Sequence, residues 1–367
     1  MEYFEIIGGK KLKGEIEVRG SKNATTPILA ATLLTKEKCV ISNVPLIEDV
    51  FRMLEIIESL GAKVSWRGER IVEIEAKKID ASKLDLVAVK RLRSSILLLG
   101  ALSGRLNNFK IPYPGGCAIG ARPLNTHFDA LQKMGVSTKE KEIKIGEKKS
   151  GCYFVDSSKR KNAEVILKEF SVTGTENAMM LAASIPGKTV IKIAAAEPHV
   201  EDLGKFLVKM GAKIKGLGTH TLEIQGKNNL KGAKHEIISD ANEAATFLIM
   251  GVATRSSITV KNALAENLDL VIEKLREFGA NFKIEKNSIK VIPAKKIKAV
   301  SKVDTRPYPG IPTDVQAPFG VLATQAEGKT FIHDSLYEGR FNYISEIEKM
   351  GAKAKEMDVH RAIIQGP

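Results

Sequence analysis

"CVISNVPLIEDVFRMLEIIESLGAKV" (residues 39–64) predicts a short β-strand, a polar loop and an amphipathic helix, in that order. The β-branched start favours the strand, and the later apolar residues recur at helical spacing. The helix is expected to end just before Gly61, because glycine past a helix C-terminus adopts positive φ without a steric penalty. Another strand should begin directly after that glycine.

The same pattern occurs four more times along the chain. The other copies are residues 109–138, 189–214, 257–282 and 330–354, and their helix-ending glycines are Gly135, Gly211, Gly279 and Gly351. Together with Gly61, these glycines follow one another at intervals of 68–76 residues. A nearly constant interval indicates an internal repeat, so the chain is expected to contain five copies of one β/α unit.

Each unit is preceded by a second helix that is almost wholly apolar. These helices are predicted at residues 25–34, 94–104, 175–185, 242–254 and 314–324. A helix that is apolar on every face should be buried. We therefore expect units with a buried helix, an amphipathic outer helix and several strands, three of which could wrap one domain with the sheets outside.

The residues that enter the buried helices carry a second signal. Each entry supplies a Ser, Thr, Asp or Asn that could cap the helix. Capping does not explain Lys22, Arg91 or Arg93 at these places, because a cation opposes the dipole at a helix N-terminus. An anion held between several helix starts would explain them. The sequence thus predicts a cleft that binds phosphates.

The composition is typical of a globular protein from a reducing compartment. The chain has 367 residues, which suggests two domains, and 43% hydrophobic residues. It shows no apolar run long enough to span a membrane and no signal-peptide pattern, so we expect a cytoplasmic protein. The three cysteines are widely spaced, which favours neither a disulfide framework nor a zinc site.

The positive charge would suit an anionic partner such as nucleic acid, phosphate esters or a membrane surface, and a lysine-rich surface without specific meaning is the alternative. The net charge is +14, but the lysines are scattered and aromatic residues make up only 5%, so nucleic-acid binding is a weak hypothesis. The six histidines show no ligand spacing, so no metal is expected, and His235 and His360 are predicted at the surface. No phosphate-binding loop of the ATP-binding type is present.

Several motifs, in the same order along the chain, resemble one enzyme family. They are GSKNATTPILAATLL (20–34), PGGCAIGARPLNTH (114–127), SVTGTEN (171–177), AAAEPHVEDL (194–203), PYPGIPTDVQA (307–317) and SLYEGRF (335–341). They resemble the UDP-N-acetylglucosamine 1-carboxyvinyltransferases of the EPSP synthase superfamily, and the resemblance covers essentially the whole chain.

The resemblance implies an α/β fold of two similar domains. Each would be an inside-out α/β barrel of three βαβαββ units, with residues 22–232 in one domain and residues 1–21 with 233–367 in the other. The family has six units and five are visible here, so the resemblance implies that the given sequence lacks a sixth unit. Whether another chain supplies that unit is left open by the sequence.

The implied reaction transfers the enolpyruvyl group of phosphoenolpyruvate to the 3′-hydroxyl of UDP-N-acetylglucosamine and releases phosphate, without a cofactor. Cys117 matches the family's proton donor, although a small buried thiol is the alternative reading. Asp314 matches the carboxylate at the sugar hydroxyl, although a plain helix cap is the alternative. Lys22 and Arg122 match the cations that hold phosphoenolpyruvate.

The resemblance also implies a set of substrate-binding residues. Those that match the family are Asn23, Arg93, Pro123, Leu124, Asn125, Thr126, His127, Ser171, Val172 and Leu336. Arg340, near the last of them, is as well explained by a salt bridge as by a ligand. Asn125 departs from the family's common aspartate, and Glu169 departs from a lysine found in some members, with Lys168 adjacent.

Two other functions are kept open by the sequence. The first is 3-phosphoshikimate 1-carboxyvinyltransferase, which shares the fold and the reaction type but lacks the cysteine loop. The second is a non-catalytic protein that binds a sugar nucleotide, as a remnant without the sixth unit.

Overall fold

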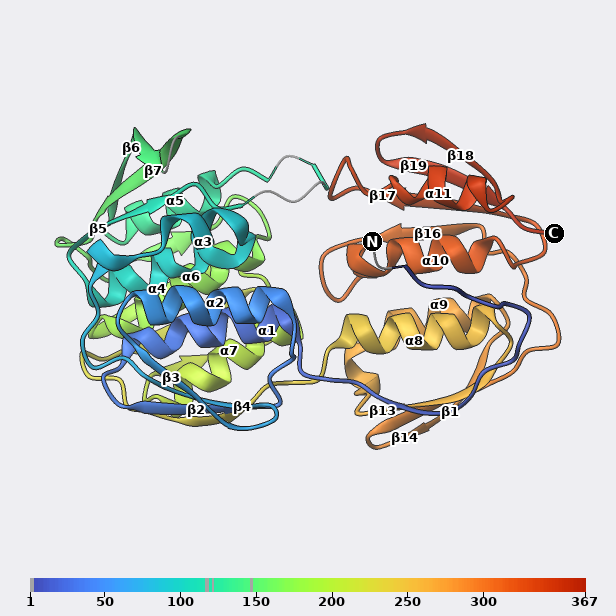
Figure 1. Ribbon diagram of the computed structural model, residues 1–367, viewed down its shortest axis with the longest axis horizontal. Helices are drawn as coiled ribbons and strands as arrows, with labels where there is room; N and C mark the ends of the chain where they lie inside the picture. Colours follow the sequence, from blue (N-terminus) through green and yellow to red (C-terminus); the bar gives the residue numbers. More distant parts are fainter. Residues whose placement is uncertain (1–2, 116–118, 121, 146–147) are drawn as a thin grey trace. The chain divides into compact units, whose positions relative to one another are not determined.

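The computed structural model describes residues 3–115, 119–120, 122–145 and 148–367, which form two compact units. Unit 1 contains the described residues of Met1–Arg19, Ile119–Ala121 and Ser239–Pro367. Unit 2 contains those of Gly20–Ala118 and Arg122–Ile238. The chain therefore starts in unit 1, builds unit 2 and returns to unit 1 (Figure 1).

Unit 2 is built from three β/α repeats. Its helices are α1 (Lys22–Ala31), η1 (Thr32–Leu34), α2 (Glu48–Ser59), η2 (Ala81–Lys83), α3 (Leu86–Arg91), η3 (Arg93–Leu97), α4 (Leu98–Arg105), α5 (Asn125–Lys133), α6 (Val172–Ser184) and α7 (Pro198–Lys209). Its strands are β2 (Lys38–Ser42), β3 (Lys63–Gly68), β4 (Ile71–Glu75), β5 (Asn108–Pro112), β6 (Ser137–Ile145), β7 (Lys148–Asp156), β8 (Glu164–Ile166), β9 (Gly187–Lys192), β10 (Lys213–Lys215), β11 (Thr221–Gly226) and β12 (Lys234–Glu236).

The strands of unit 2 form three separate sheets. Their orders are β12-β2-β4-β3, β5-β7-β6 and β10-β11-β9-β8. The neighbouring strands pair antiparallel, except that β12 pairs parallel with β2 and β8 parallel with β9. Because β12 completes the sheet of β2, the last strand of the unit closes onto the first repeat.

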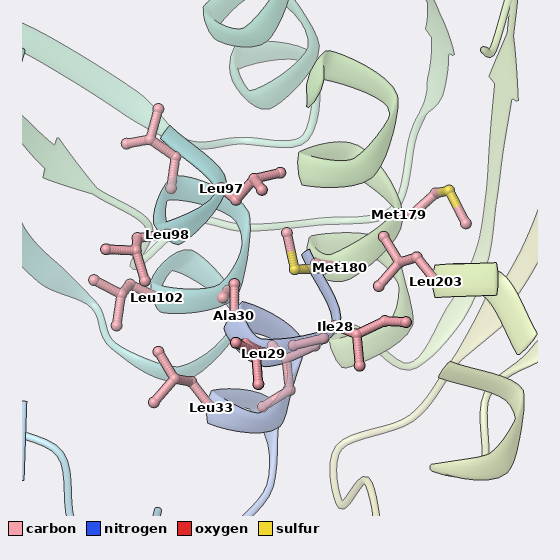
Figure 2. Close-up of a cluster of buried hydrophobic side chains, with 14 of the residues drawn as sticks. Ile28, Leu29, Ala30, Leu33, Leu97, Leu98, Leu102, Met179, Met180 and Leu203 are labelled. Carbon is pink, nitrogen blue, oxygen red and sulfur yellow. The ribbon is translucent and has the colours of Figure 1, made fainter. Parts of the chain in front are cut away.

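The apolar helices form the centre of unit 2, as their composition predicts. Residues of α1, α4, α6 and α7 pack into one hydrophobic cluster, and Figure 2 shows side chains of that cluster. Most residues of α1, α4 and α6 are buried, including the polar Thr25, Ser103 and Asn177. The sheets lie outside these helices in Figure 1, so the predicted mixed α/β fold is confirmed, while the closure of the unit into a barrel stays a prediction.

The amphipathic helices end where the glycines predict. The glycines after α2, α5 and α7 are Gly61, Gly135 and Gly211, with φ of 98°, 80° and 108°. Positive φ at this place lets the chain leave the helix and enter the next strand. The same holds in unit 1 for Gly279 and Gly351.

Unit 1 contains the two remaining repeats. Its helices are α8 (Ala241–Ala253), η4 (Ala265–Asn267), α9 (Asp269–Glu277), η5 (Thr313–Val315), α10 (Gln316–Ala323) and α11 (Tyr343–Lys349). Its strands are β1 (Lys13–Glu17), β13 (Ser257–Lys261), β14 (Asn281–Glu285), β15 (Ser288–Ile292), β16 (Lys302–Thr305), β17 (Lys329–Asp334), β18 (Lys353–Asp358) and β19 (Arg361–Gln365). They form sheets of order β1-β13-β15-β14 and β16-β17-β19-β18, in which β1 and β16 pair parallel with their neighbours.

The two inner helices of unit 1 are less completely buried than those of unit 2. α8 and α10 contact each other and the sheets, but Thr246 of α8 and Val321 of α10 are exposed, and several other residues of both helices are only partly buried. The apolar residues of the N-terminal segment, Tyr3–Ile7, are also largely exposed. The prediction that every apolar helix is buried is therefore only partly confirmed in this unit.

None of the helices that the structure describes is both long and apolar enough to cross a bilayer.

Candidate functional site

Cys117, the implied proton donor, lies outside the described residues. The described residues that follow it, Ile119 and Gly120, are grouped with unit 1. There the amide of Gly339 donates to the carbonyl of Ile119 (3.0 Å). Gly120 has a φ of +123°, and a Cβ atom on it would lie 2.3 Å from Oε2 of Glu338. The chain thus needs a glycine where it passes the segment that carries Arg340.

Two cations and a buried histidine lie together in unit 2. Nη2 of Arg93 donates to the carbonyl of Arg122 (2.5 Å), which fixes the backbone at the start of the Arg122–His127 segment. His127 is 3% exposed, and its Nε2 lies 2.8 Å from Oγ1 of Thr173. Burial, followed by the charge of Arg93, lowers the pKa of His127 to about 4. The imidazole is therefore neutral at neutral pH, and the net charge of this cluster comes from the arginines.

The segment after Arg122 is only partly open to a ligand. Pro123 and Asn125 are exposed, whereas Leu124 and Thr126 are buried. Oγ1 of Thr126 donates to Oε1 of Glu169 (2.7 Å). Glu169 therefore anchors the first turn of α5.

The start of α6 has a side-chain cap. Oγ of Ser171 accepts from the amide of Gly174 (3.2 Å), and its carbonyl accepts from Oγ1 of Thr175 (2.8 Å). Val172 is the first helical residue, and Lys168, four residues earlier, pairs with Asp129. A capped helix N-terminus carries partial positive charge, so it is a suitable place for a phosphate.

The start of α1 is close to the same elements. Ser21 caps the helix, Lys22 and Asn23 form its first turn, and Nζ of Lys22 lies 3.2 Å from Oδ2 of Asp49. η3, which begins at Arg93, packs against both α1 and α6. Unit 2 therefore brings the elements that carry Lys22, Arg93 and Ser171 into contact, whereas the convergence of their starts on one phosphate-binding cleft stays a prediction.

Asp314 lies in unit 1 and is not a helix cap. Pro312 occupies the cap position of η5, and no side chain caps this turn. Oδ1 of Asp314 instead accepts from Nη2 of Arg340 (2.5 Å), and Oδ2 accepts from Nδ2 of Asn242 (3.2 Å). The Asp314 side chain is still 44% exposed. The salt-bridge reading of Arg340 is confirmed, while a role in binding a ligand stays a prediction.

Leu336 lies between the end of β17 and Arg340. It is partly exposed, and its amide donates to Oδ1 of Asp334 (2.9 Å). The other oxygen of Asp334 accepts from Oγ1 of Thr313 (2.5 Å). Asp334 is fully buried, so it links the turn of Asp314 to the segment of Leu336 and Arg340.

Sequence reasoning missed Asn242 and Asp334. The motif of Asn242 was interpreted only as a helix entry, and Asp240 is indeed the cap of α8. The contacts of Asn242 and Asp334 with the Asp314 region span 72 and 21 residues. A local pattern carries no signal for such pairings.

The prediction for His235 is wrong. This residue is 5% exposed, and its Nε2 lies 3.0 Å from Oδ1 of Asp202. Oδ2 of Asp202 accepts from the amide of Ile238 (3.1 Å). The pair joins α7 to β12, and the polar sequence around His235 gives no indication of it. Among the described residues, no group of His, Cys, Asp or Glu could hold a metal ion.

Comparison with known proteins identifies relatives along the whole chain. Residues 6–366 match the model of the family EPSP synthase (3-phosphoshikimate 1-carboxyvinyltransferase). UDP-N-acetylglucosamine 1-carboxyvinyltransferase 1 of Carboxydothermus hydrogenoformans is 41% identical over 366 residues, which cover 100% of this chain and 84% of the relative. UDP-N-acetylglucosamine 1-carboxyvinyltransferase of Campylobacter hominis is 40% identical over 368 residues, with coverages of 100% and 85%.

Solved structures support the fold. The enolpyruvyl transferase NikO from Streptomyces tendae superposes with a TM-score of 0.84 at 20% identity, covering 98% of this chain and 83% of that one. EPSP synthase from Acinetobacter baumannii superposes with a TM-score of 0.70 at 18% identity, with the same coverages. At these identities the likeness concerns the mixed α/β fold alone.

Proposed function

Because the chain belongs to the EPSP synthase family, we propose that it transfers the enolpyruvyl group of phosphoenolpyruvate to the 3′-hydroxyl of UDP-N-acetylglucosamine. Phosphate is the second product, and the reaction is the first committed step of peptidoglycan synthesis in the cytoplasm. We choose UDP-N-acetylglucosamine as the acceptor because the chain is 41% identical, over its whole length, to a UDP-N-acetylglucosamine 1-carboxyvinyltransferase. The alternative, 3-phosphoshikimate 1-carboxyvinyltransferase, is not favoured, because the relatives that are 41% and 40% identical are UDP-N-acetylglucosamine 1-carboxyvinyltransferases.

The reaction consists of an addition and an elimination. In the addition, a proton reaches the methylene carbon of phosphoenolpyruvate, and the 3′-oxygen bonds to the adjacent carbon as its own proton leaves. In the elimination, the new methyl group loses a proton and the bond to phosphate breaks. We assign the first proton to Cys117 and the acceptance of the hydroxyl proton to Asp314, which is exposed enough to meet a substrate.

The anionic substrates need cations and backbone donors. We assign phosphoenolpyruvate to Lys22 and Arg122, with Asn23 beside the reacting centre, because a guanidinium and an ammonium suit carboxylate and phosphate groups. We assign the sugar nucleotide to four groups of residues, namely Arg93, Pro123–His127, Ser171–Val172 and Leu336. The capped start of α6 supports the diphosphate part of this assignment.

We further propose that units 2 and 1 are the two barrel domains of this fold, and that a sixth repeat covers the inner helices of unit 1. The exposure of Val321 on α10 and of Tyr3–Ile7 supports a missing neighbour. The match covers 84% of the Carboxydothermus relative, so part of that protein has no counterpart in this chain. Adding the unmatched part of the relative to a mixture or a fusion with this chain should raise the melting temperature and reduce binding of an apolar dye, and no change in either would oppose the proposal.

Phosphate release tests the function. The purified chain is incubated with phosphoenolpyruvate alone, with UDP-N-acetylglucosamine, or with shikimate 3-phosphate as acceptor. Release that requires the sugar nucleotide supports the proposal, and release only with shikimate 3-phosphate contradicts it. Asp314→Asn should abolish most of the release, whereas the matched change Asp269→Asn, at an exposed position of α9, should leave it unchanged.

If the folded chain binds the sugar nucleotide but releases no phosphate, the alternative of a non-catalytic protein that binds a sugar nucleotide is favoured instead.

A further inference from the structure

The carboxylate of Asp314 has a hydrogen-bond donor on each oxygen. Arg340 donates to Oδ1 and Asn242 donates to Oδ2, at 2.5 and 3.2 Å. One donor is charged and the other is neutral. Each carboxylate oxygen can accept about two hydrogen bonds, so lone pairs remain for a proton from substrate.

Both donors are held in place by their own surroundings. Asn242 lies in the first turn of α8, where Oδ1 of Asp240 accepts from the amides of Asn242 and Glu243. Arg340 has a side chain that is 20% exposed, and its guanidinium lies 5.4 Å from the ring centre of Tyr337. The donors therefore come from two elements, α8 and the segment that follows β17, and each donor has a contact of its own besides the one with Asp314.

The backbone around Asp314 is fixed as well. Thr313 donates to the buried Asp334, which also accepts from the amide of Leu336. This contact sets the turn but leaves the two side-chain torsions of Asp314 free. The contacts of Asn242 and Arg340 restrict those torsions.

We propose that Asn242 is a positioning residue that, together with Arg340, sets the orientation of the Asp314 carboxylate for the reaction. The inference rests on the proposed function of Asp314 as the base. A base must meet the hydroxyl at about 2.6–3.2 Å, and a displacement of about 1 Å can lower a rate about 100-fold. Asn242 orients the carboxylate without adding charge, which distinguishes it from Arg340.

The first test is steady-state kinetics of phosphate release. Asn242→Ala should lower kcat about 10-fold, within the range expected for a misplaced base, and change each KM less than about 2-fold. Asn242→Asp should be slower still, because two carboxylates then face each other. A raised KM with unchanged kcat would overturn the proposal, since it would make Asn242 a substrate contact.

A double-mutant cycle separates positioning from general damage to the fold. In an Asp314→Ala background, Asn242→Ala should cause no further loss of the residual rate, because its target is absent. An equal fold-loss in both backgrounds would overturn the proposal, because Asn242 would then act without Asp314.

A second readout does not depend on turnover. The side-chain amide signals of Asn242 in a ¹⁵N-labelled chain are assigned by their absence in Asn242→Ser. Asp314→Ala should shift these signals, and the matched Asp269→Ala should not. If Asp314→Ala leaves these signals unshifted, the proposed contact between Asn242 and Asp314 is wrong. A chain that releases no phosphate but shows the shift would contradict the proposed function while supporting the positioning contact.

Discussion

Gly100→Ala tests how closely α4 and α6 pack at the centre of unit 2. A Cβ atom at position 100 would lie 2.4 Å from the carbonyl oxygen of Asn177 and 2.7 Å from its Cα. Both are backbone atoms, so no side chain can rotate away. The amide of Gly100 also donates to Oδ1 of Asn177 (2.6 Å), and separating the helices would stretch that bond. The neighbouring Leu98 and Leu102 are part of the cluster in Figure 2.

Two opposing effects decide the sign of the change in stability. Alanine favours a helix interior over glycine by about 1 kcal/mol. Overpacking costs about 1–3 kcal/mol, and a buried donor that loses its acceptor costs about 1–3 kcal/mol more. We therefore expect the free energy of unfolding to fall by about 3 kcal/mol. Without the close contact, the same substitution would raise it.

Urea unfolding followed by fluorescence gives the measurement. Trp66 is the only tryptophan of the chain and lies in β3, so its signal reports on unit 2. The control is Gly68→Ala, where a Cβ atom would meet only side-chain carbons of Ile71, the nearest at 3.5 Å. Gly100→Ala should lower the midpoint at an unchanged urea dependence, and Gly68→Ala should not. A midpoint above that of the unmodified chain would refute the packing argument.

Three further predictions concern other parts of the chain. Gln316→Leu should raise the free energy of unfolding by about 1–2 kcal/mol in calorimetry, since both amide atoms of Gln316 are buried without a hydrogen-bond partner among the described residues. Stability should fall as the pH drops from about 6.5 towards 4, by up to about 1.4 kcal/mol per pH unit. The reason is that His127 is protonated at a higher pH in the unfolded chain than in the folded one, where its pKa is about 4. In urea unfolding measured at several pH values, His127→Gln should make the free energy of unfolding depend less on pH. Gly120→Ala should lower kcat/KM for phosphoenolpyruvate in the phosphate assay, and adding Glu338→Ala should not restore it, because the φ of +123° remains unfavourable for alanine.

The repeat was predictable because it rests on local physics. The glycines that end the outer helices have positive φ in every repeat, and Ser21, Ser171 and Asp240 cap their helices. Each of these features depends on residues within a few positions of one another. The apolar composition of the inner helices likewise predicted burial, and it succeeded fully where three repeats surround the helices.

The site was less predictable because its contacts cross long stretches of chain. The local reading of Asp314 was a helix cap, yet its oxygens face Arg340, 26 residues away, and Asn242, 72 residues away. His235 was placed at the surface for the same reason, since its partner Asp202 lies 33 residues away. Composition near a polar residue does not reveal whether tertiary structure supplies a partner that makes burial possible.

Burial distinguishes the roles of three aspartates that otherwise look alike. Asp202, Asp334 and Asp314 each accept hydrogen bonds on both carboxylate oxygens. Asp202 and Asp334 are buried, so all their contacts serve to join elements of the fold. Asp314 is 44% exposed and keeps lone pairs that a substrate hydroxyl can reach. Two donors that orient a carboxylate without enclosing it are what a general base requires, and this combination singles out Asp314 among the three.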